Sequence, residues 1–338
     1  MKSKYLSFNP INWLLEKTDP CSRFLTLRDL VGDGSHLKEY DFLMTDARIK
    51  KICRLSDNGI LGNKKHFDLY YHGSMWCFSE SVALGMDRRT DFIEKTAEFI
   101  MERAQNKDGG FTLNWTPPIS TACRTGDMLK HLILCGYDDE RIKKGIEWIL
   151  ERQRHDGGWL HCPLSGGCDY LKLTLFKKSG KGLLREKNKN VKSCIYATIA
   201  CAYALQLYKK KKPGIGSDAL PAAAEFFLSI KLFKNSKGDA IKPNRGWNRD
   251  FRLLGLPLLS QYDILKGLML IAGEGMISDE RASEAFNIVI SKQNRDGTWN
   301  LENAAAGMMH GNEKSPPIGE KNKLVTLEVM RLFKYADL

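Results

Sequence analysis

The segments QNKDGGF at 105–111, QRHDGGW at 153–159 and QNRDGTW at 293–299 align without gaps. The first two begin 48 residues apart, and the third begins 140 residues after the second, which is close to three such periods. Shorter copies occur at 57–60 and 244–247. A fixed period of this size predicts a repeat architecture. The residues that define the repeat are Gln105, Phe111, Gln153, Trp159, Trp247, Gln293 and Trp299.

Each copy follows a segment with one apolar face and precedes a segment that is apolar on nearly all sides. In 138–153, Ile142, Ile146 and Ile149 recur at helical spacing, whereas 195–205 reads IYATIACAYAL. The repeating unit is therefore predicted to be a solvated outer helix, an Asp-Gly turn and a buried inner helix. No sustained alternation of apolar and polar residues favours strands.

These units predict an all-α fold, an α/α-toroid of about five to six outer/inner helix pairs. An open solenoid is the alternative arrangement of stacked pairs; the greater apolarity of the inner helices favours a closed ring. The expected outer helices are 38–54, 90–105, 138–153, 217–231 and 278–292, and the expected inner helices are 70–85, 119–135, 192–208, 260–273 and 322–335.

The whole chain, 1–338, is interpreted as one toroid domain. Residues 1–37 form a degenerate N-terminal unit, with helices near 10–17 and 22–31 that could close the ring. Residues 38–338 hold the repeat units and include an inserted loop at 163–191. Ser217 and Ser278 are the expected helix caps of 217–231 and 278–292.

The repeated motif itself has a structural interpretation. Asp-Gly supplies a tight turn, because glycine tolerates the left-handed conformation after a helix end. The Trp or Phe that follows is expected to pack back between neighbouring helix pairs. The motif is therefore predicted to stabilise the fold and to take no part in chemistry.

These Q-x-x-D-G-G-[FW] segments resemble the QW motifs of squalene–hopene cyclase and the repeats of protein prenyltransferase β subunits. The resemblance to this terpenoid cyclase/protein prenyltransferase superfamily covers about 40–338, and the chain is similar to a prokaryotic-type member. It implies an α/α barrel with a central cavity, often apolar and often holding an isoprenoid.

The catalytic signatures of that superfamily are missing from this sequence. The nearest match to the D-x-D-D acid of class II cyclases is GYDD at 136–139, which lacks the first Asp. A D-D-x-x-D metal motif fails at Ile142, and the one D-x-C segment, DPC at 19–21, lies outside the region of resemblance. The resemblance thus implies the fold and leaves the activity open.

Four cysteines form a candidate metal site. Cys123 and Cys194 open successive inner helices, which start at the same end of a toroid, and the loop between those helices carries Cys162 and Cys168. Thiolates suit tetrahedral zinc, and helix N-termini favour the thiolate form. We expect a zinc ion, structural if all four thiolates bind it. The alternative is a set of ordinary cysteines without metal.

Several polar residues on buried helices are candidates to face a cavity. Glu80, Asp127 and Asp263 are acids on otherwise apolar inner helices, and a buried carboxylate must be paired or protonated. His72 is expected to face the rim that holds Cys123, and Tyr262 falls near the matching position of the fourth inner helix. The alternative is a solvent-exposed His72 and ordinary ion pairs for the acids. Their partners would be Arg124, Lys130 and Lys266.

Composition argues against a membrane-spanning, secreted or nucleic-acid-binding protein. The formal net charge is +12, the cysteine count is an odd nine, and no apolar run reaches the ~18 residues of a membrane span. We therefore predict no transmembrane segment, no signal peptide and a cytoplasmic location. The positive charge indicates a solvated Lys-rich surface or an anionic partner, such as a membrane surface. The lysine run at 209–212 closes a helix, where cations are favoured anyway, so we expect no specific nucleic acid.

Together these observations predict a ligand-binding or interaction protein with a structural cysteine metal site. The ligand would be an apolar, isoprenoid-like small molecule. The alternative is an enzyme that acts on an apolar isoprenoid-type substrate in the central cavity.

Overall fold

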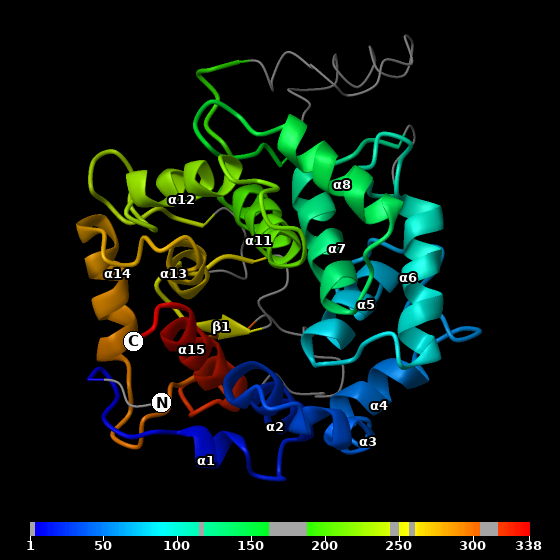
Figure 1. The fold of residues 1–338 in the computed structure, drawn as a ribbon, viewed down its shortest axis with the longest axis horizontal. Coiled ribbons are helices and arrows are strands. Elements are labelled where there is room, and N and C mark those ends of the chain that lie inside the picture. The colour runs from blue at the N-terminus through cyan, green and yellow to red at the C-terminus, as the bar shows by residue number, and fades with distance from the viewer. Residues whose placement is uncertain (1–3, 115–117, 162–187, 244–249, 257–260, 305–316) are drawn as a thin grey trace. The chain divides into compact units, whose positions relative to one another are not determined.

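Helices are the dominant regular structure of the described chain, so the all-α prediction is confirmed (Figure 1). The computed structural model describes residues 4–114, 118–161, 188–243, 250–256, 261–304 and 317–338. The chain splits into two compact units. Unit 1 comprises Met1–Ser56, Glu80–Met86 and Phe227–Leu338, and unit 2 comprises Asp57–Ser79 and Asp87–Phe226.

Unit 2 contains the repeats with the first two strong motifs. Its helices are the first part of α5 (Ser74–Ala83), α6 (Asp91–Ala104), α7 (Ala122–Leu134), α8 (Glu140–Glu151), α11 (Ile195–Lys211) and most of α12 (Ala219–Ser229). The outer helix α8 packs on the inner helix α7 and presents Ile142, Ile146 and Ile149 as its buried face. The apolar spacing read from the sequence thus marks the side of α8 that is buried.

The inner helices α7 and α11 of unit 2 are parallel and unusually close. Near their start, the Cys201 thiol of α11 lies 3.3 Å from the Ala122 carbonyl of α7, and past their end Lys211 Nζ donates to the Tyr137 carbonyl. A Cβ atom at Gly126 would lie 2.4 Å from the carbonyl carbon of Ala200, so this approach requires glycine. Both helices therefore begin at the same end of unit 2.

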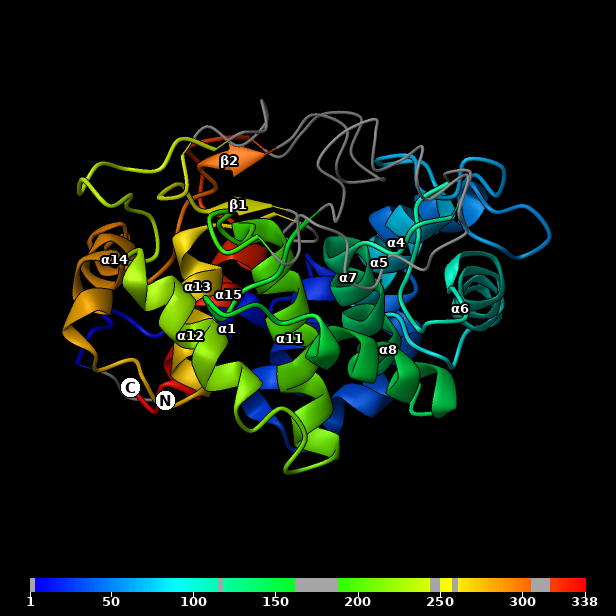
Figure 2. The ribbon, with the colours of Figure 1, turned by 90° about the horizontal axis from the view of Figure 1, so that it is seen from above.

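Unit 1 contains both ends of the chain. Its elements are α1 (Ile11–Leu14), α2 (Pro20–Thr26), a π-helix (Leu27–Val31), a 3₁₀-helix (Ser35–Glu39), α3 (Tyr40–Leu43), α4 (Ala47–Arg54), α13 (Ile264–Gly273), α14 (Glu280–Ser291) and α15 (Lys323–Tyr335). The inner helix α13 packs between α14 and α15. Two short strands, β1 (Gly255–Leu256) and β2 (Asn303–Ala304), pair in parallel near α15 (Figure 2).

The three Asp-Gly turns share one geometry. The glycine after the aspartate has a positive φ, between +78° and +94°, in each copy: Gly109, Gly157 and Gly297. The N–H of each motif aromatic residue donates to a threonine hydroxyl one turn into the next inner helix, over 2.8–3.1 Å. These pairs are Phe111 with Thr125, Trp159 with Thr198, and Trp299 with Thr326. All three aromatic side chains are fully buried, which fits a purely structural role.

At the first two Asp-Gly turns, the motif glutamine contacts the start of the next outer helix along the chain. Gln105 Nε2 donates to the Arg141 carbonyl in the first turn of α8 over 2.8 Å. Gln153 Nε2 donates in the same way to the Ala219 carbonyl of α12 over 2.7 Å. Each motif glutamine thus joins its own turn to the next helix pair along the chain.

At the third turn, the N-terminal segment takes the place of a following outer helix. The Ser7 N–H donates to Gln293 Oε1 over 2.7 Å, and a Cβ atom at Gly297 would lie 1.9 Å from the Phe8 carbonyl oxygen. This contact joins residues separated by almost the whole chain, and it lies within unit 1.

The same N-terminal segment also packs against the last helix. α2 lies beside α15, and Lys323 at the start of α15 donates to Glu16 over 3.1 Å (Figure 1). Arg331 Nε donates to Asp29 Oδ2 over 3.0 Å. Burial acts to raise the pKa of Asp29, but the charges of Arg331 and Arg28 outweigh it and hold that pKa well below its usual range.

Three expected boundaries are corrected. The outer helix 38–54 is split, because Asp46 caps a new helix at Ala47. The inner helix 70–85 begins only at Ser74, so His72 lies in the preceding loop. The cap of α14 is Asp279, whose side chain accepts from the Arg281 N–H, and not Ser278. At α4 and α14 a side chain that accepts backbone N–H groups decides where the helix starts.

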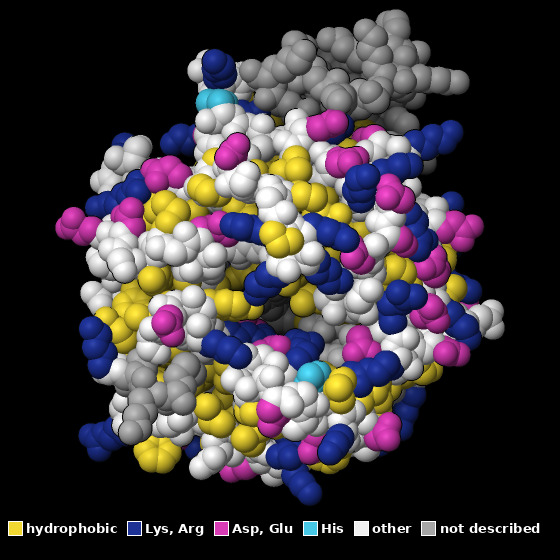
Figure 3. All heavy atoms as spheres, in the orientation of Figure 1, with side chains coloured by type: hydrophobic (Ala, Val, Ile, Leu, Met, Phe, Trp, Pro, Cys, Tyr) yellow, Lys and Arg dark blue, Asp and Glu magenta, His cyan; other side chains and the backbone are white. Residues whose placement is uncertain are grey.

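Charged side chains cover much of the surface. On the face in Figure 3, Lys and Arg side chains are interspersed with Asp and Glu. Among the described helices, none combines the length and apolar composition that a bilayer crossing requires.

Candidate functional site

The inner helix α7 carries four ionisable side chains that are buried or largely buried. Arg124, Asp127 and His131 have exposures of 6%, 2% and 1%, and the Lys130 side chain is 13% exposed. They share α7 with apolar residues such as Met128 and Leu129. An inner helix that only filled a core would need none of these charges, so this cluster on α7 is the candidate site.

Asp127 lies at the centre of the cluster. Its Oδ2 is 3.8 Å from Arg124 Nη1, and its Oδ1 is 3.7 Å from Lys130 Nζ and 3.6 Å from His131 Nδ1. The Ser79 hydroxyl of α5 donates to Oδ2 over 3.4 Å. One carboxylate therefore serves three nitrogen groups, each at a distance longer than a good charge-assisted hydrogen bond.

His131 has a defined orientation. Its Nδ1 is 2.8 Å from the Asp127 carbonyl oxygen. A carbonyl can only accept, so Nδ1 carries the hydrogen, and Nε2 is the nitrogen left to take up a second proton. The ring is thus fixed to the backbone of its own helix.

Arg124 is the least satisfied member of the cluster. Its Nε is enclosed and has no hydrogen-bond partner, and the guanidinium forms no hydrogen bond with any residue that the structure describes. Its one ion pair there is the 3.8 Å approach to Asp127. A guanidinium has five N–H donors and stays charged at any physiological pH, so Arg124 is left with unused donors.

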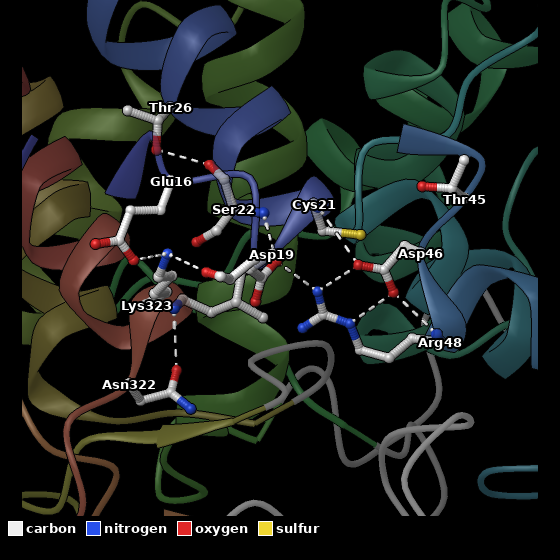
Figure 4. Close-up of polar contacts among 12 residues, drawn as sticks. Glu16, Asp19, Cys21, Ser22, Thr26, Thr45, Asp46, Arg48, Asn322 and Lys323 are labelled. Carbon is white, nitrogen blue, oxygen red and sulfur yellow. Dashed lines mark hydrogen bonds and ion pairs between the residues drawn. The ribbon is translucent and has the colours of Figure 1, made fainter. Parts of the chain in front are cut away.

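A second charge cluster, in unit 1, is largely buried, and its charges are paired with one another. Figure 4 shows the guanidinium of Arg48 between the carboxylates of Asp19 and Asp46. Arg48 Nη2 donates to Asp19 Oδ1 over 2.6 Å and to Asp46 Oδ2 over 2.7 Å, while Nε donates to Asp46 Oδ1 over 2.9 Å. The two carboxylates also cap helices, since Asp19 accepts from the Ser22 N–H and Asp46 from the Arg48 N–H.

This pairing shifts the proton equilibria of the unit 1 cluster. Burial acts to raise the pKa of Asp46, but hydrogen bonds and charge from Arg48 outweigh it and lower that pKa. Burial raises the pKa of the Cys21 thiol well above its usual range. The cluster is saturated with its own partners, so we assign it a structural role.

Asp263 is a buried helix cap in unit 1. Its carboxylate accepts from the Lys266 N–H over 3.0 Å and from the Gly255 N–H over 3.3 Å. Burial raises the pKa of Asp263 to about 6, against these hydrogen bonds and the Lys266 charge. Tyr262 is buried and donates to the Leu232 carbonyl over 2.7 Å. Both residues are placed to hold the start of α13.

The other two cavity candidates lie in different surroundings. Glu80 is buried on α5, in the part that belongs to unit 1. His72 is exposed, and its carbonyl accepts from the Asn63 N–H over 2.7 Å in the loop before α5. Of the five candidates, only Asp127 lies in the cluster on α7.

Two of the four predicted metal ligands lie near one another. Cys123 is in the first turn of α7, and Cys194 is the N-cap residue of the parallel helix α11. Burial raises the pKa of the Cys201 thiol well above its usual range, and the charges of Cys123 and Cys194 add to this rise. Within the described parts of the chain, no three metal-binding side chains form a metal site. Cys162, Cys168 and Trp247 lie outside the described residues.

The importance of Arg124 was missed from sequence alone. The spacing of Arg124 and Asp127, three residues apart on a helix, indicated an ion pair, and the pair is present. Sequence spacing does not give the distance between the two groups, nor the number of cations that share the carboxylate. The one available signal was an excess of basic residues between Arg124 and His131 on a buried helix.

Comparison with known proteins adds little. No protein-family model matches the sequence, and no curated protein matches it. Solved structures similar to the chain include a variant of the type II terpene cyclase MstE from Scytonema in complex with geranylgeranyl dihydroxybenzoate, with 10% identity, a TM-score of 0.33, and 89% of this chain and 98% of that chain covered. The apo form of MstE has 11% identity and a TM-score of 0.31, with 89% of this chain and 99% of that chain covered. A protein from Actinoplanes has 12% identity and a TM-score of 0.31, with 86% of this chain and 98% of that chain covered. Such values are too low to assign a function.

Proposed function

We propose that this protein binds an apolar small molecule of isoprenoid type beside α7 in unit 2. The observation that carries the proposal is the group of buried ionisable side chains on α7, placed among apolar inner-helix residues. Ligand sites are mostly apolar and have a few convergent polar groups, and the surroundings of Asp127 have this composition. The α/α-toroid remains part of the proposal, supported by the contact of Ser7 with Gln293.

Native mass spectrometry of the purified protein tests this function. We expect a co-purified apolar molecule, or saturable binding of farnesol or geranylgeraniol at one molecule per chain. A preparation that carries no small molecule and binds neither alcohol would contradict the proposal. The charge reversal Glu140→Lys is the matched control, since this exposed side chain on α8 pairs with Lys143 and its replacement should leave binding unchanged.

Binding is favoured over catalysis at this site. Asp127 lies within 4 Å of Arg124, Lys130 and His131, surroundings that suit a carboxylate better than a proton-donating acid. We therefore expect no proton-initiated cyclisation of squalene or oxidosqualene. Cyclised product formed by the pure protein, and lost in Asp127→Asn, would establish the enzyme alternative.

We also propose that Cys123, Cys162, Cys168 and Cys194 hold one structural zinc ion. The placement of Cys123 and Cys194 at the starts of two parallel helices supports the site. Four thiolates close a tetrahedral shell and leave no position for water, so the ion would stabilise unit 2 and would not catalyse.

Elemental analysis tests the metal directly. We expect one zinc per chain and a lower melting temperature after chelation, because metal binding is linked to folding. Cys123→Ser should lose the metal, whereas Cys53→Ser, a change at a cysteine of unit 1, should keep it. Protein without stoichiometric metal, and with a melting curve that does not respond to chelator, would show that these are ordinary cysteines.

A further inference from the structure

The described chain supplies no hydrogen-bond acceptor to the guanidinium of Arg124. Its side chain is 6% exposed, its Nε is enclosed without a partner, and its one ion pair is 3.8 Å long. Taking a charged group from water without hydrogen bonds is costly, and an arginine cannot escape the cost by losing its proton. An acceptor is therefore expected at this position.

Other arginines with little exposure have such acceptors. Arg48 donates to Asp19 and Asp46, and Arg154 donates to the Asn188 and Val191 carbonyls over 3.0 and 2.5 Å. Burial by itself thus does not leave arginines of this chain without hydrogen bonds. The state of Arg124 is particular to its position on α7.

Asp127 does not neutralise Arg124 alone. The same carboxylate lies 3.7 Å from Lys130 Nζ and 3.6 Å from His131 Nδ1. A water molecule could accept a hydrogen bond from Arg124, but it carries no charge. An anion supplies both the acceptor and the charge, and arginine matches a planar carboxylate with two parallel hydrogen bonds.

We propose that Arg124 binds the carboxylate of an apolar ligand, so that the natural ligand is a long-chain or isoprenoid carboxylic acid. This inference rests on the proposed function and specifies the head of the ligand. A single negative charge is favoured over a doubly charged phosphate, because Asp127 is already 3.8 Å from the guanidinium and would repel a second charge.

Isothermal titration with three probes tests the inference: farnesoic acid, farnesol and farnesyl phosphate. They share one apolar chain and differ only in the head. We expect farnesoic acid to bind at least about tenfold more tightly than farnesol. Arg124→Met should remove this advantage, so that farnesoic acid and farnesol bind the variant with affinities within about twofold of each other. Arg141→Met, at an exposed arginine of the same unit paired with Glu98 and Asp139, is the control and should keep the advantage.

The outcomes separate the two proposals. Binding of farnesol with no preference for the acid, or a preference that survives in Arg124→Met, would overturn the role of Arg124 while the binding function stands. Tighter binding of the phosphate than of the acid, lost in Arg124→Met, would overturn the carboxylate assignment. No binding of any probe would overturn both proposals. Circular dichroism of Arg124→Met checks that a loss of preference does not come from unfolding.

Discussion

Arg48 in unit 1 and Arg124 in unit 2 are both buried, yet their surroundings differ. Arg48 contacts two carboxylates with hydrogen bonds of 2.6–2.9 Å, and both carboxylates cap helices. Arg124 shares one carboxylate with Lys130 and His131 and forms no hydrogen bond within the described chain. The difference teaches that burial of a charge does not show its role. Whether its donors are already used decides between a structural and a binding role.

The largest expected effect is at Arg48. Arg48→Met would leave the buried carboxylate of Asp46 and the partly buried carboxylate of Asp19 without their cation. Breaking a buried pair on one side is strongly destabilising, so we expect a loss of about 3–5 kcal/mol of unfolding free energy. Urea denaturation at pH 7 measures it. A loss below about 1 kcal/mol would mean that the cluster in Figure 4 is not structural.

Gly126→Ala tests the packing that holds the Arg124 cluster. The added methyl group would meet the backbone of Ala200, which cannot move aside as a flexible side chain can. Overpacking of this kind costs about 1–3 kcal/mol. The melting temperature should fall, and the proposed zinc content should fall with it, because Cys123 and Cys194 would be separated. Gly275→Ala, where no atom lies within 4 Å, is the comparison without steric overlap: its positive φ adds about 1–2 kcal/mol of backbone strain, but no zinc should be lost.

The pH dependence of stability offers a further comparison at Asp263, because its carboxylate accepts two hydrogen bonds and still has a raised pKa. With a folded pKa of about 6, the folded protein keeps a proton that the unfolded chain releases near pH 4. The free energy of unfolding therefore falls as the pH rises from about 4 to 6. The fall is about 3 kcal/mol, since each unit of difference between the folded and unfolded pKa corresponds to about 1.4 kcal/mol.

Asp263→Asn removes this titration. The unfolding free energy of the variant minus that of wild type should therefore be larger at pH 7 than at pH 4. Loss of the Gly255 hydrogen bond lowers this difference equally at both pH values. Denaturation of both proteins at the two pH values measures the change. Asp279, whose pKa is lowered to about 2 by its hydrogen bond with Arg281, is the control: its titration lies below about pH 4, so Asp279→Asn should show little change relative to wild type between pH 4 and pH 7. Equal differences at both pH values for Asp263→Asn would contradict the raised pKa.

The smallest expected effect on stability is at Arg124. Replacing an unsatisfied buried charge by an apolar side chain of similar length is often neutral or stabilising. Arg124→Met should therefore change the unfolding free energy by less than about 1 kcal/mol, or raise it, in contrast with Arg48→Met. A loss of about 3 kcal/mol or more would show that Arg124 is structural and would remove the difference between the two clusters.

The sequence predicted what depends on neighbours along the chain. Helical spacing located α6, α8 and α14 within a few residues, and the Asp-Gly turns have the expected left-handed glycines. Helix starts were less accurate where a capping side chain decided them, as with Asp46 and Asp279. The sequence offered no way to see that Phe8 packs on Gly297, because that contact depends on the path of the whole chain.

The candidate site was predicted less completely. Asp127 was identified as a buried acid, but the same reasoning selected Asp263, whose carboxylate caps α13. Both acids lie on apolar helices, and sequence alone does not show which backbone N–H groups and cations reach each one. The role of Arg124 depends on donors left unused, a property of three-dimensional surroundings.

The contact of the N-terminal segment with the third turn bears on synthesis in the cell. Ser7 and Phe8 leave the ribosome long before their partners Gln293 and Gly297. Unit 2, which ends at Phe226, can assemble during translation, whereas residues 4–31 must wait for α15. During that interval their apolar side chains are open to chaperones, and a ribosome that stalls after Phe226 would release a chain with half of its fold complete.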